Sequence, residues 1–300
     1  MTYSIVARDP VTGQFGAAVQ SHWFAAGVVC WARAGIGAVA TQATALIEHG
    51  PLGLEAMFAG ASAAEALAAR LATDADREHR QVAMVDQRGG VAAHTGASCI
   101  RETGHRTGDG FSCQANMMRR STVWDAMHEA FAGSSGDLAG RLLLTLEAAE
   151  AEGGDIRGRQ AARILVVRAE PTDRPWEDVL VDLRVDDDPA PLRELRRLLE
   201  LQRVYDRLEA AEEMELAGDL EGSFAERQAA MAAVPGNPEI AFWTAISLAL
   251  HGRLEEGRAA LAVALPADPG WAELLRRLGD QRLMELTPEL VADLLPRTDG

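Results

Sequence analysis

The chain has 300 residues and a formal net charge of −16, with 48% hydrophobic and 25% charged residues. This composition is typical of a folded globular protein and excludes collagen-like and intrinsically disordered chains. The negative charge is spread evenly along the sequence and no stretch is strongly basic, so we expect neither nucleic acid nor an anionic membrane as a partner.

The beginning of the chain predicts two pairs of strands followed by a pair of helices. The strands are short runs of β-forming residues, and turn sequences join them at residues 9–13 and 35–37. The second helix starts with a capping box formed by Ser62 and Glu65. The predicted strands span residues 3–7, 15–21, 28–34 and 38–44, and the helices span 52–59 and 63–71.

The following elements repeat this order. Two strands, a glycine-rich loop with one more strand, a second helix pair with Asp137 as the expected N-cap, and two last strands are predicted. Consecutive strands with short turns pair in antiparallel sheets, and paired helices cover such sheets from outside. We therefore predict an α+β fold, a four-layer αββα sandwich, with a two-layer α+β domain as the alternative. These strands span 81–86, 91–95, 111–114, 161–167 and 179–185, and the helices 122–132 and 138–150.

The character of the sequence changes after an acidic, proline-containing segment at residues 186–191. Beyond it the pattern predicts only helices, and residues 217–220 have a counterpart at 251–254, a spacing of about 34 residues. Helical hairpins with this period resemble tetratricopeptide repeats. We predict an αββα domain at residues 1–188 and a small all-α helical-repeat domain at 189–300. The tail is expected to serve packing or self-association, or to bind a protein partner.

Two residue counts narrow the possible chemistry. All 29 basic residues are arginine. The absence of lysine excludes Schiff-base catalysis and a phosphate-binding lysine, and leaves the chain start as the only primary amine. The three cysteines lack CxxC spacing and the histidines are scattered, so we expect buried apolar thiols, no metal and no cofactor.

The sequence also suggests a location. No apolar run approaches the ~20 residues of a membrane helix. The first residues show no basic stretch followed by an apolar one, as a secretory leader would. We therefore expect a cytoplasmic protein.

Thr2 is the strongest candidate for a catalytic residue. Methionine aminopeptidase removes Met1 when a small residue follows. A terminal threonine then carries a hydroxyl nucleophile and an α-amine of pKa about 8, which accepts the hydroxyl proton. The alternative is an ordinary chain start, since many proteins begin with Met-Thr.

Collinear motifs are spread over about the first 190 residues. They include Thr2-Tyr3-Ser4-Ile5-Val6-Ala7, Gly16-Ala17-Ala18-Val19, Arg80-Gln81-Val82-Ala83, Gln114-Ala115-Asn116-Met117 and Gly153-Gly154-Asp155-x-Arg157-Gly158-x-Gln160. Together they resemble an uncharacterised bacterial family of N-terminal-nucleophile (Ntn) hydrolase fold, known as a domain of unknown function. The resemblance implies a fold whose members mostly hydrolyse amides with a terminal Thr, Ser or Cys, and it implies no particular substrate.

The chain departs from the family pattern at three positions, of which two lie near these motifs and the third is Asp188, where the family commonly has histidine. Ala115 stands where the family usually has glycine, and Ala161 where it usually has serine. Added bulk at Ala115 and a lost hydroxyl at Ala161 favour an alternative function, a non-catalytic binding or scaffold protein that retains the Ntn fold.

Further site residues follow from their positions in the predicted elements. Ser4 shares the face of Thr2 because side chains alternate along a strand. The turn at Gly35-x-Gly37 and the side-chain amide of Asn116 are candidate donors to the oxyanion of amide hydrolysis, although the glycines also suit a plain tight turn. Other residues expected at the substrate pocket are Ser21, Thr41, Gln42, Gln114 and Gln160; Ser21, Thr41 and Gln42 equally suit a polar core.

The glycine-rich loop near residue 155 suggests how substrate is bound. Asp155 and Arg157 lie two residues apart, so they can clamp a small zwitterion, with its carboxylate on Arg157 and its ammonium on Asp155. The alternative is that the two side chains bind each other and hold the loop. The sequence thus predicts an amidohydrolase of the Ntn type that acts on a small amide or peptide-like substrate.

Overall fold

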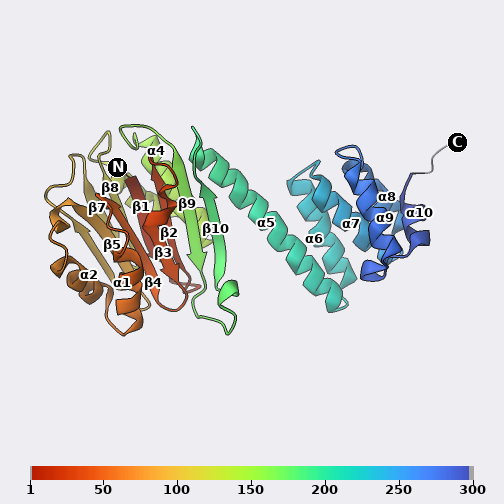
Figure 1. Ribbon diagram of the computed structural model, residues 1–300, viewed down its shortest axis with the longest axis horizontal. Coiled ribbons are helices and arrows are strands. Elements are labelled where there is room, and N and C mark those ends of the chain that lie inside the picture. Colours follow the sequence, from red (N-terminus) through yellow and green to blue (C-terminus); the bar gives the residue numbers. More distant parts are fainter. Residues whose placement is uncertain (1, 297–300) are drawn as a thin grey trace. The chain divides into compact units, whose positions relative to one another are not determined.

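The computed structural model describes residues 2–296, so Met1, whose removal the sequence predicts, lies outside the described residues. The chain forms two compact units, Met1–Leu199 and Glu200–Gly300. The boundary between them lies within the long helix α5 (Pro191–Leu216). Figure 1 shows the elements of both units along the chain.

The first turns of α5 belong to the first unit. Leu192, Leu195 and Leu199 are buried in the apolar core that this unit's larger sheet and its helices share. Burial of such a leucine side chain stabilises a fold by about 1.5–3 kcal/mol. Because these three leucines belong to its core, the first unit extends beyond residue 188, where the sequence predicted the domain boundary.

The larger sheet of the first unit is antiparallel and has six strands in the order β10-β9-β2-β1-β8-β7. The N-terminal strand thus lies in the middle of the sheet, paired with β2 on one side and β8 on the other. The strands are β1 (Thr2–Arg8), β2 (Phe15–Ser21), β7 (Gly104–Gly108), β8 (Phe111–Asn116), β9 (Ala161–Val167) and β10 (Val179–Val185).

The sequence did not predict β7, because this edge strand reads Gly-His-Arg-Thr-Gly and its residues are partly or fully exposed. Without a buried face it lacks the alternation of apolar and polar residues that marks a strand. Antiparallel backbone pairing with the buried β8 holds β7 in the sheet, although the sequence of β7 has no strand pattern of its own.

The smaller sheet has four strands in the order β3-β4-β5-β6, and all neighbours are antiparallel. Short turns join most of these strands, as the sequence indicates. The strands are β3 (Cys30–Arg33), β4 (Gly37–Ala43), β5 (Arg80–Asp86) and β6 (Val91–Thr95).

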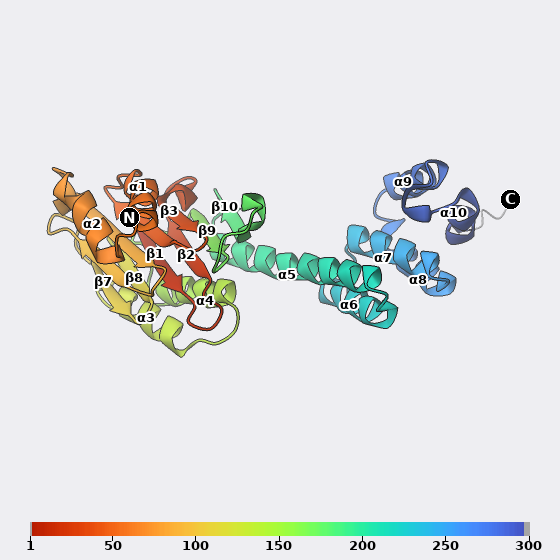
Figure 2. The ribbon, with the colours of Figure 1, turned by 90° about the horizontal axis from the view of Figure 1, so that it is seen from below.

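The two sheets face each other, and helices cover their outer faces. Val6, Ala17 and Ala40 are among the buried side chains between the sheets. Figure 2 shows one helix pair on each side of the strands. Helices α1 (His49–Phe58) and α2 (Ala63–Ala72) pack on the smaller sheet, and α3 (Val123–Gly133) and α4 (Leu138–Ala151) pack on the larger one.

Both predicted helix caps are present. The Ser62 hydroxyl accepts from the backbone N–H of Glu65, and the Glu65 carboxylate accepts from the backbone N–H of Ser62. Asp137 likewise accepts from the backbone N–H of Gly140 at the start of α4. These bonds satisfy N–H groups that a helix start otherwise leaves without a partner.

The three cysteines are free thiols, and Cys30 and Cys113 are fully buried. Burial raises the pKa of the Cys30 thiol to about 12 and raises that of Cys113 as well. A buried thiol with a raised pKa stays protonated and is a poor nucleophile. The two side chains thus act as small apolar residues, as predicted.

The second unit consists of helices around two apolar clusters. The landmarks that recur in the sequence mark helix starts, since Leu220 begins α6 and its counterpart Leu254 begins α8. The helices are α6 (Leu220–Ala233), α7 (Pro238–Leu250), α8 (Leu254–Ala264), α9 (Gly270–Asp280) and α10 (Pro288–Leu294).

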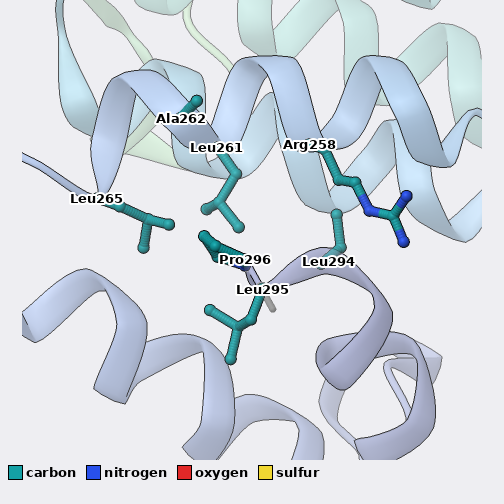
Figure 3. A pocket seen from close by; sticks show the side chains of 7 residues that line it. All are labelled: Arg258, Leu261, Ala262, Leu265, Leu294, Leu295 and Pro296. Atoms are coloured by element: carbon teal, nitrogen blue, oxygen red, sulfur yellow. The ribbon is translucent and has the colours of Figure 1, made fainter. Parts of the chain in front are cut away.

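A cavity of about 500 Å³ lies between α8 and the end of α10, and Figure 3 shows its lining. Its walls are apolar apart from Arg258, which donates Nε to the backbone oxygen of Asp293. Leu261 of α8 and Leu265, the residue after this helix, face Leu294 and the residues after it. No helix within residues 2–296 has both the length and the apolar character needed to cross a membrane.

Candidate functional site

Thr2 begins the central strand β1 and is almost completely buried, with 4% of its surface exposed. Its side chain points between the two sheets, because it shares the face of Val6 in the core between them. The Thr2 hydroxyl donates to the hydroxyl of Ser21 at 3.0 Å. The predicted nucleophile thus lies inside the first unit, with a second hydroxyl group beside it.

A cavity of about 290 Å³ opens beside Thr2. It is bounded by the ends of β1, β2 and β4 and by the loops that follow β2, β4 and α4. Ala43, the last residue of β4, has a positive φ of 70°, a conformation that few residues other than glycine adopt without strain. The lining residues are Thr2, Ser21, Trp23, Val29, Gln42, Ala43, Ala45 and Arg157.

The main-chain carbonyl of Thr2 is held by two side-chain amides. Gln42 donates Nε2 to this oxygen at 3.3 Å, and Asn116 donates Nδ2 to it at 3.3 Å. Gln42 comes from the smaller sheet and Asn116 from the larger one, where it pairs in register with Thr2. The position of the threonine backbone is therefore fixed from both sheets.

Ser4 and Gln114 continue this network along the same face. The Ser4 hydroxyl donates to Gln42 Oε1 at 2.7 Å and accepts from Gln114 Nε2 at 2.7 Å. Gln114 Oε1 in turn accepts from the hydroxyl of Ser112 at 2.9 Å. Ser4 and Gln114 are completely buried, so they hold the network together and do not line the cavity.

Gln81 is the member of the network that sequence reasoning missed as a site residue. Its Oε1 accepts from Gln42 Nε2 at 2.7 Å and from Asn116 Nδ2 at 3.1 Å. Its Nε2 donates to the backbone oxygens of Gly104 and Ala115, each at 3.0 Å. The signal available in the sequence was a glutamine directly before the apolar run Val82–Val85 of the same strand.

Tyr3, the neighbour of Thr2, is anchored on the opposite face of the sheet. Its side chain is buried against α4, and its hydroxyl donates to Glu150 Oε2 at 2.8 Å. Burial and the nearby Glu150 carboxylate raise the pKa of Tyr3 well above its ordinary value, so the phenol remains a donor. β1 is thus fixed on both faces at its first residues.

The loop after α4 brings Asp155 and Arg157 next to the cavity, but only Arg157 lines it. The Asp155 side chain is fully buried, and its Oδ2 accepts from Arg157 Nη2 at 3.0 Å and from the backbone N–H of His22 at 3.2 Å. Its Oδ1 accepts from the backbone N–H of Arg157 at 2.8 Å. The predicted binding of an ammonium group by Asp155 is therefore wrong, because protein donors occupy both of its oxygens.

Three predicted pocket residues lie away from Thr2. Gly37 is at the far end of β4, five residues or about 17 Å from Gln42, and its Cα approaches the Val85 carbonyl so closely that a Cβ would lie 2.1 Å from it. The glycine therefore permits close strand packing and offers no donor near Thr2.

Thr41 points to the opposite face of β4 from Gln42, toward the helices that cover Val39. Its hydroxyl is buried and has no hydrogen-bond partner among the described residues. Gln160 donates Nε2 to Asp187 Oδ1 at 3.1 Å and does not line the cavity. The sequence placed both residues near the right strand ends but did not reveal which way the side chains point.

The departures from the family pattern at Ala115 and Ala161 have different positions. Ala115 pairs with Tyr3 and lies in the core beneath the helices, so its methyl group points away from the cavity. Ala161 pairs in register with Ser21, beside the candidate site. Only the change at Ala161 thus lies where a lost hydroxyl affects the surroundings of Thr2.

A buried charged cluster supports the cavity wall after β4. Asp74 Oδ2 accepts from Arg80 Nε at 2.8 Å and lies 3.1 Å from Nε2 of the completely buried His49. Arg80 also donates Nη1 to the backbone oxygen of Thr44 at 2.7 Å. Because Thr44 lies between two residues of the lining, this cluster fixes the shape of that wall.

The same cluster predicts an acid-sensitive fold. Burial lowers the pKa of His49 although the Asp74 carboxylate opposes this, and the hydrogen bond from Arg80 lowers the pKa of Asp74. The unfolded chain then binds more protons, so stability present above pH ~6.5 is lost as the pH falls through the folded pKa of His49, and a further loss begins below pH ~4 at Asp74. We expect the melting temperature to fall on acidification, by about 2–4 °C for each kcal/mol lost.

The variant His49→Gln checks this assignment by thermal unfolding at a series of pH values. It should remove the part of the decline that begins as the pH falls below ~6.5 and leave the part that begins below pH ~4. An unchanged pH profile in the variant would show that His49 is not the titrating group.

The family model described as a family of unknown function (DUF1028) matches residues 2–195. The chain belongs to this family. The crystal structure of protein SPO2555 from Silicibacter pomeroyi, also ascribed to DUF1028, is 33% identical in sequence, with a TM-score of 0.60. The match covers 66% of this chain and 84% of that chain. No curated protein matches the chain.

The DUF1028 match ends within the first turns of α5 and thus covers both sheets and the four helices that pack on them. The candidate cavity and the amide network lie entirely in this part of the chain. The second unit lies outside the DUF1028 match.

Proposed function

We propose that this DUF1028 protein is an Ntn-type amidohydrolase that acts in the cytoplasm on a small amide or peptide-like substrate. The observation that carries the proposal is the Thr2 hydroxyl at the wall of a cavity, with the carbonyl of the same residue held by Gln42 and Asn116. The layer order of helices, sheet, sheet and helices supports an Ntn-hydrolase-like αββα sandwich.

The first chemical step requires Thr2 to be the first residue of the chain. Its α-amine accepts the proton of the hydroxyl, and Oγ1 attacks the amide carbon of the substrate to form a C–O bond. The tetrahedral intermediate then expels the amine as the C–N bond breaks, and the α-ammonium gives its proton to the leaving nitrogen. The product of this step is an ester on Thr2.

The second step regenerates the enzyme. Water attacks the ester carbon while the α-amine accepts one of its protons, and the C–O bond to Thr2 breaks. The carboxylic acid leaves and the proton returns to Oγ1. Ser21 accepts a hydrogen bond from Oγ1 in the resting state and so orients the hydroxyl before attack.

Asn116 acts as a positioning residue in this mechanism. Its side-chain amide donates to the Thr2 carbonyl and to Gln81, so both of its N–H groups are used within the network. Its role is to hold the nucleophile in place, which is a different role from the oxyanion donor expected from the sequence.

We also propose that the second unit is a tetratricopeptide-like tail for self-association, with binding of a protein partner as the other outcome. The equivalent starts of α6 and α8 support the repeat, and the apolar cavity between α8 and α10 offers a surface for contact. Sedimentation of the full chain at several concentrations tests self-association, and a monomer at all of them would contradict it.

Mass spectrometry of the intact protein tests the enzyme proposal directly. We expect the mass to lack Met1, and treatment with an acylating β-lactone to add one adduct per chain at Thr2. A chain that retains Met1 and still hydrolyses an amide would contradict the mechanism. No adduct on a chain that begins at Thr2 would instead favour a scaffold protein that retains the fold.

A further inference from the structure

The charge in the lining of the cavity beside Thr2 is positive. Among the described residues of its lining, Arg157 alone is charged, and 34% of its side-chain surface is exposed. The carboxylate that accompanies it belongs to Asp155, whose side chain is 0% exposed. A molecule in the cavity therefore meets a guanidinium group but no carboxylate.

Asp155 orients this guanidinium, which remains partly exposed. Arg157 donates Nε to Oδ1 at 3.3 Å and Nη2 to Oδ2 at 3.0 Å, so the carboxylate takes one edge of the planar group. A guanidinium has five N–H donors in a fixed plane and binds a carboxylate through two parallel bonds. The pairing with Asp155 thus restricts the rotamers of Arg157 and lowers the entropy that is lost when it binds an anion.

The other walls suit a short apolar segment next to the anion. Trp23 contributes its indole, and Val29, Ala43 and Ala45 contribute aliphatic groups. The volume of about 290 Å³ is at the lower end of the ~300–1,000 Å³ found for small-molecule sites. Thr2 and Arg157 line the same cavity, so a ligand that fills it contacts both residues.

We propose that the substrate of this site is a small amide that carries a carboxylate, and that Arg157 binds this carboxylate while the amide carbon lies against Thr2. The reaction at the amide rests on the proposed function. Recognition of the carboxylate is a binding property that can be measured without any reaction.

A pair of neutral and anionic probes tests the inference on the variant Thr2→Ala, which cannot form an ester. N-acetylglycine and N-acetylglycinamide differ only in carboxylate against carboxamide. We expect the acid to bind at least about 10-fold more tightly by calorimetric titration, a difference of ~1.4 kcal/mol. This preference should disappear in the double variant with Arg157→Gln and remain in part with Arg157→Lys, which keeps the charge but not the paired geometry.

Arg159→Gln is the matched control, because it removes an arginine from the same loop. Arg159 pairs with Glu150 and does not line the cavity, so the preference for the acid should persist. Equal affinity for both probes, no binding of N-acetylglycine at ~10 mM, or a preference that survives Arg157→Gln would each overturn the inference. A preference lost equally in the Arg159 variant would also overturn it, since general electrostatics would then suffice.

The two proposals fail in different ways. Adduct formation at Thr2 together with equal probe affinities would support the amidohydrolase and contradict the carboxylate recognition by Arg157. A preference for the anionic probe that depends on Arg157, without any adduct at Thr2, would support the anion-binding site and contradict the proposed hydrolase. If Arg157→Gln does not fold, the two probes are compared on chains with an intact Arg157. Equal affinity for both probes would then still overturn the inference.

Discussion

Replacement of Thr2 by alanine should abolish both β-lactone labelling and amide turnover, with a loss of at least about 10³-fold in rate. The hydroxyl is the nucleophile of the proposed mechanism, and no neighbouring group combines a nucleophile with an amine. The side chain is almost fully buried, and its one hydrogen bond among the described residues is to Ser21, so the variant should fold. Intact-mass spectrometry and a rate assay on the same preparation measure the effect.

Two variants serve as controls for this result. Thr2→Ser keeps the hydroxyl and the terminal amine after removal of Met1, so labelling should persist. Thr41→Ala removes a buried threonine hydroxyl that has no hydrogen-bond partner within residues 2–296 and faces the helices, so labelling should be unchanged. Full activity in Thr2→Ala would exclude the terminal nucleophile and direct attention to an enzyme that uses the loop at Asp155 and Arg157.

Gln81→Leu should be the most destabilising substitution in the network, by about 2–5 kcal/mol in urea unfolding. The side chain is completely buried and accepts from Gln42 and Asn116 while donating to the backbone of two neighbouring strands. Leucine removes one hydrogen-bond partner from each of these buried groups, and each group left unsatisfied costs roughly 1–3 kcal/mol. The rate of labelling at Thr2 should fall as well, because both amides that hold its carbonyl lose their orientation.

Gln87→Leu is the matched control, since it makes the same change at an exposed position in the turn after β5. Surface changes of this kind alter stability by no more than ~0.5 kcal/mol. If Gln81→Leu were no more destabilising than Gln87→Leu, the network would not contribute to the packing of the two sheets against each other. Normal labelling in a folded Gln81→Leu chain would separate the stability of the network from the positioning of Thr2.

Much of the fold was predictable because its elements have strong local signals. The strands β1, β2 and β5 are runs of apolar residues between turns, and capping residues mark the starts of α2 and α4. The edge strand β7 was missed because it has no buried face of its own. The first compact unit extends to Leu199, beyond the proline-containing linker that marks the boundary in the sequence, because the burial of the α5 leucines is visible only in the structure.

The sequence predicted many residues of the candidate site but not how their side chains are arranged. Thr2, Ser21, Gln42 and Arg157 line one cavity as expected, while Gly37, Thr41 and Gln160 do not. A polar residue near a strand end can face either side of the sheet, and a shift of one residue reverses the face. The sequence identified Asp155 as a charged loop residue, but the saturation of its carboxylate depends on Arg157 and on the backbone N–H of His22, which is 133 residues away along the chain.

The amino-acid sequence by itself determined the order of the strands and helices apart from β7, the family, and the absence of any lysine amine, because these depend on residues that are close along the chain or on simple counts. Only the tertiary structure decided that Gln81 joins Gln42 and Asn116 around the carbonyl of Thr2, and that Arg157 is the charged group of the cavity. The reason is that these contacts join strands far apart in sequence, and the packing of the two sheets sets which side chains meet.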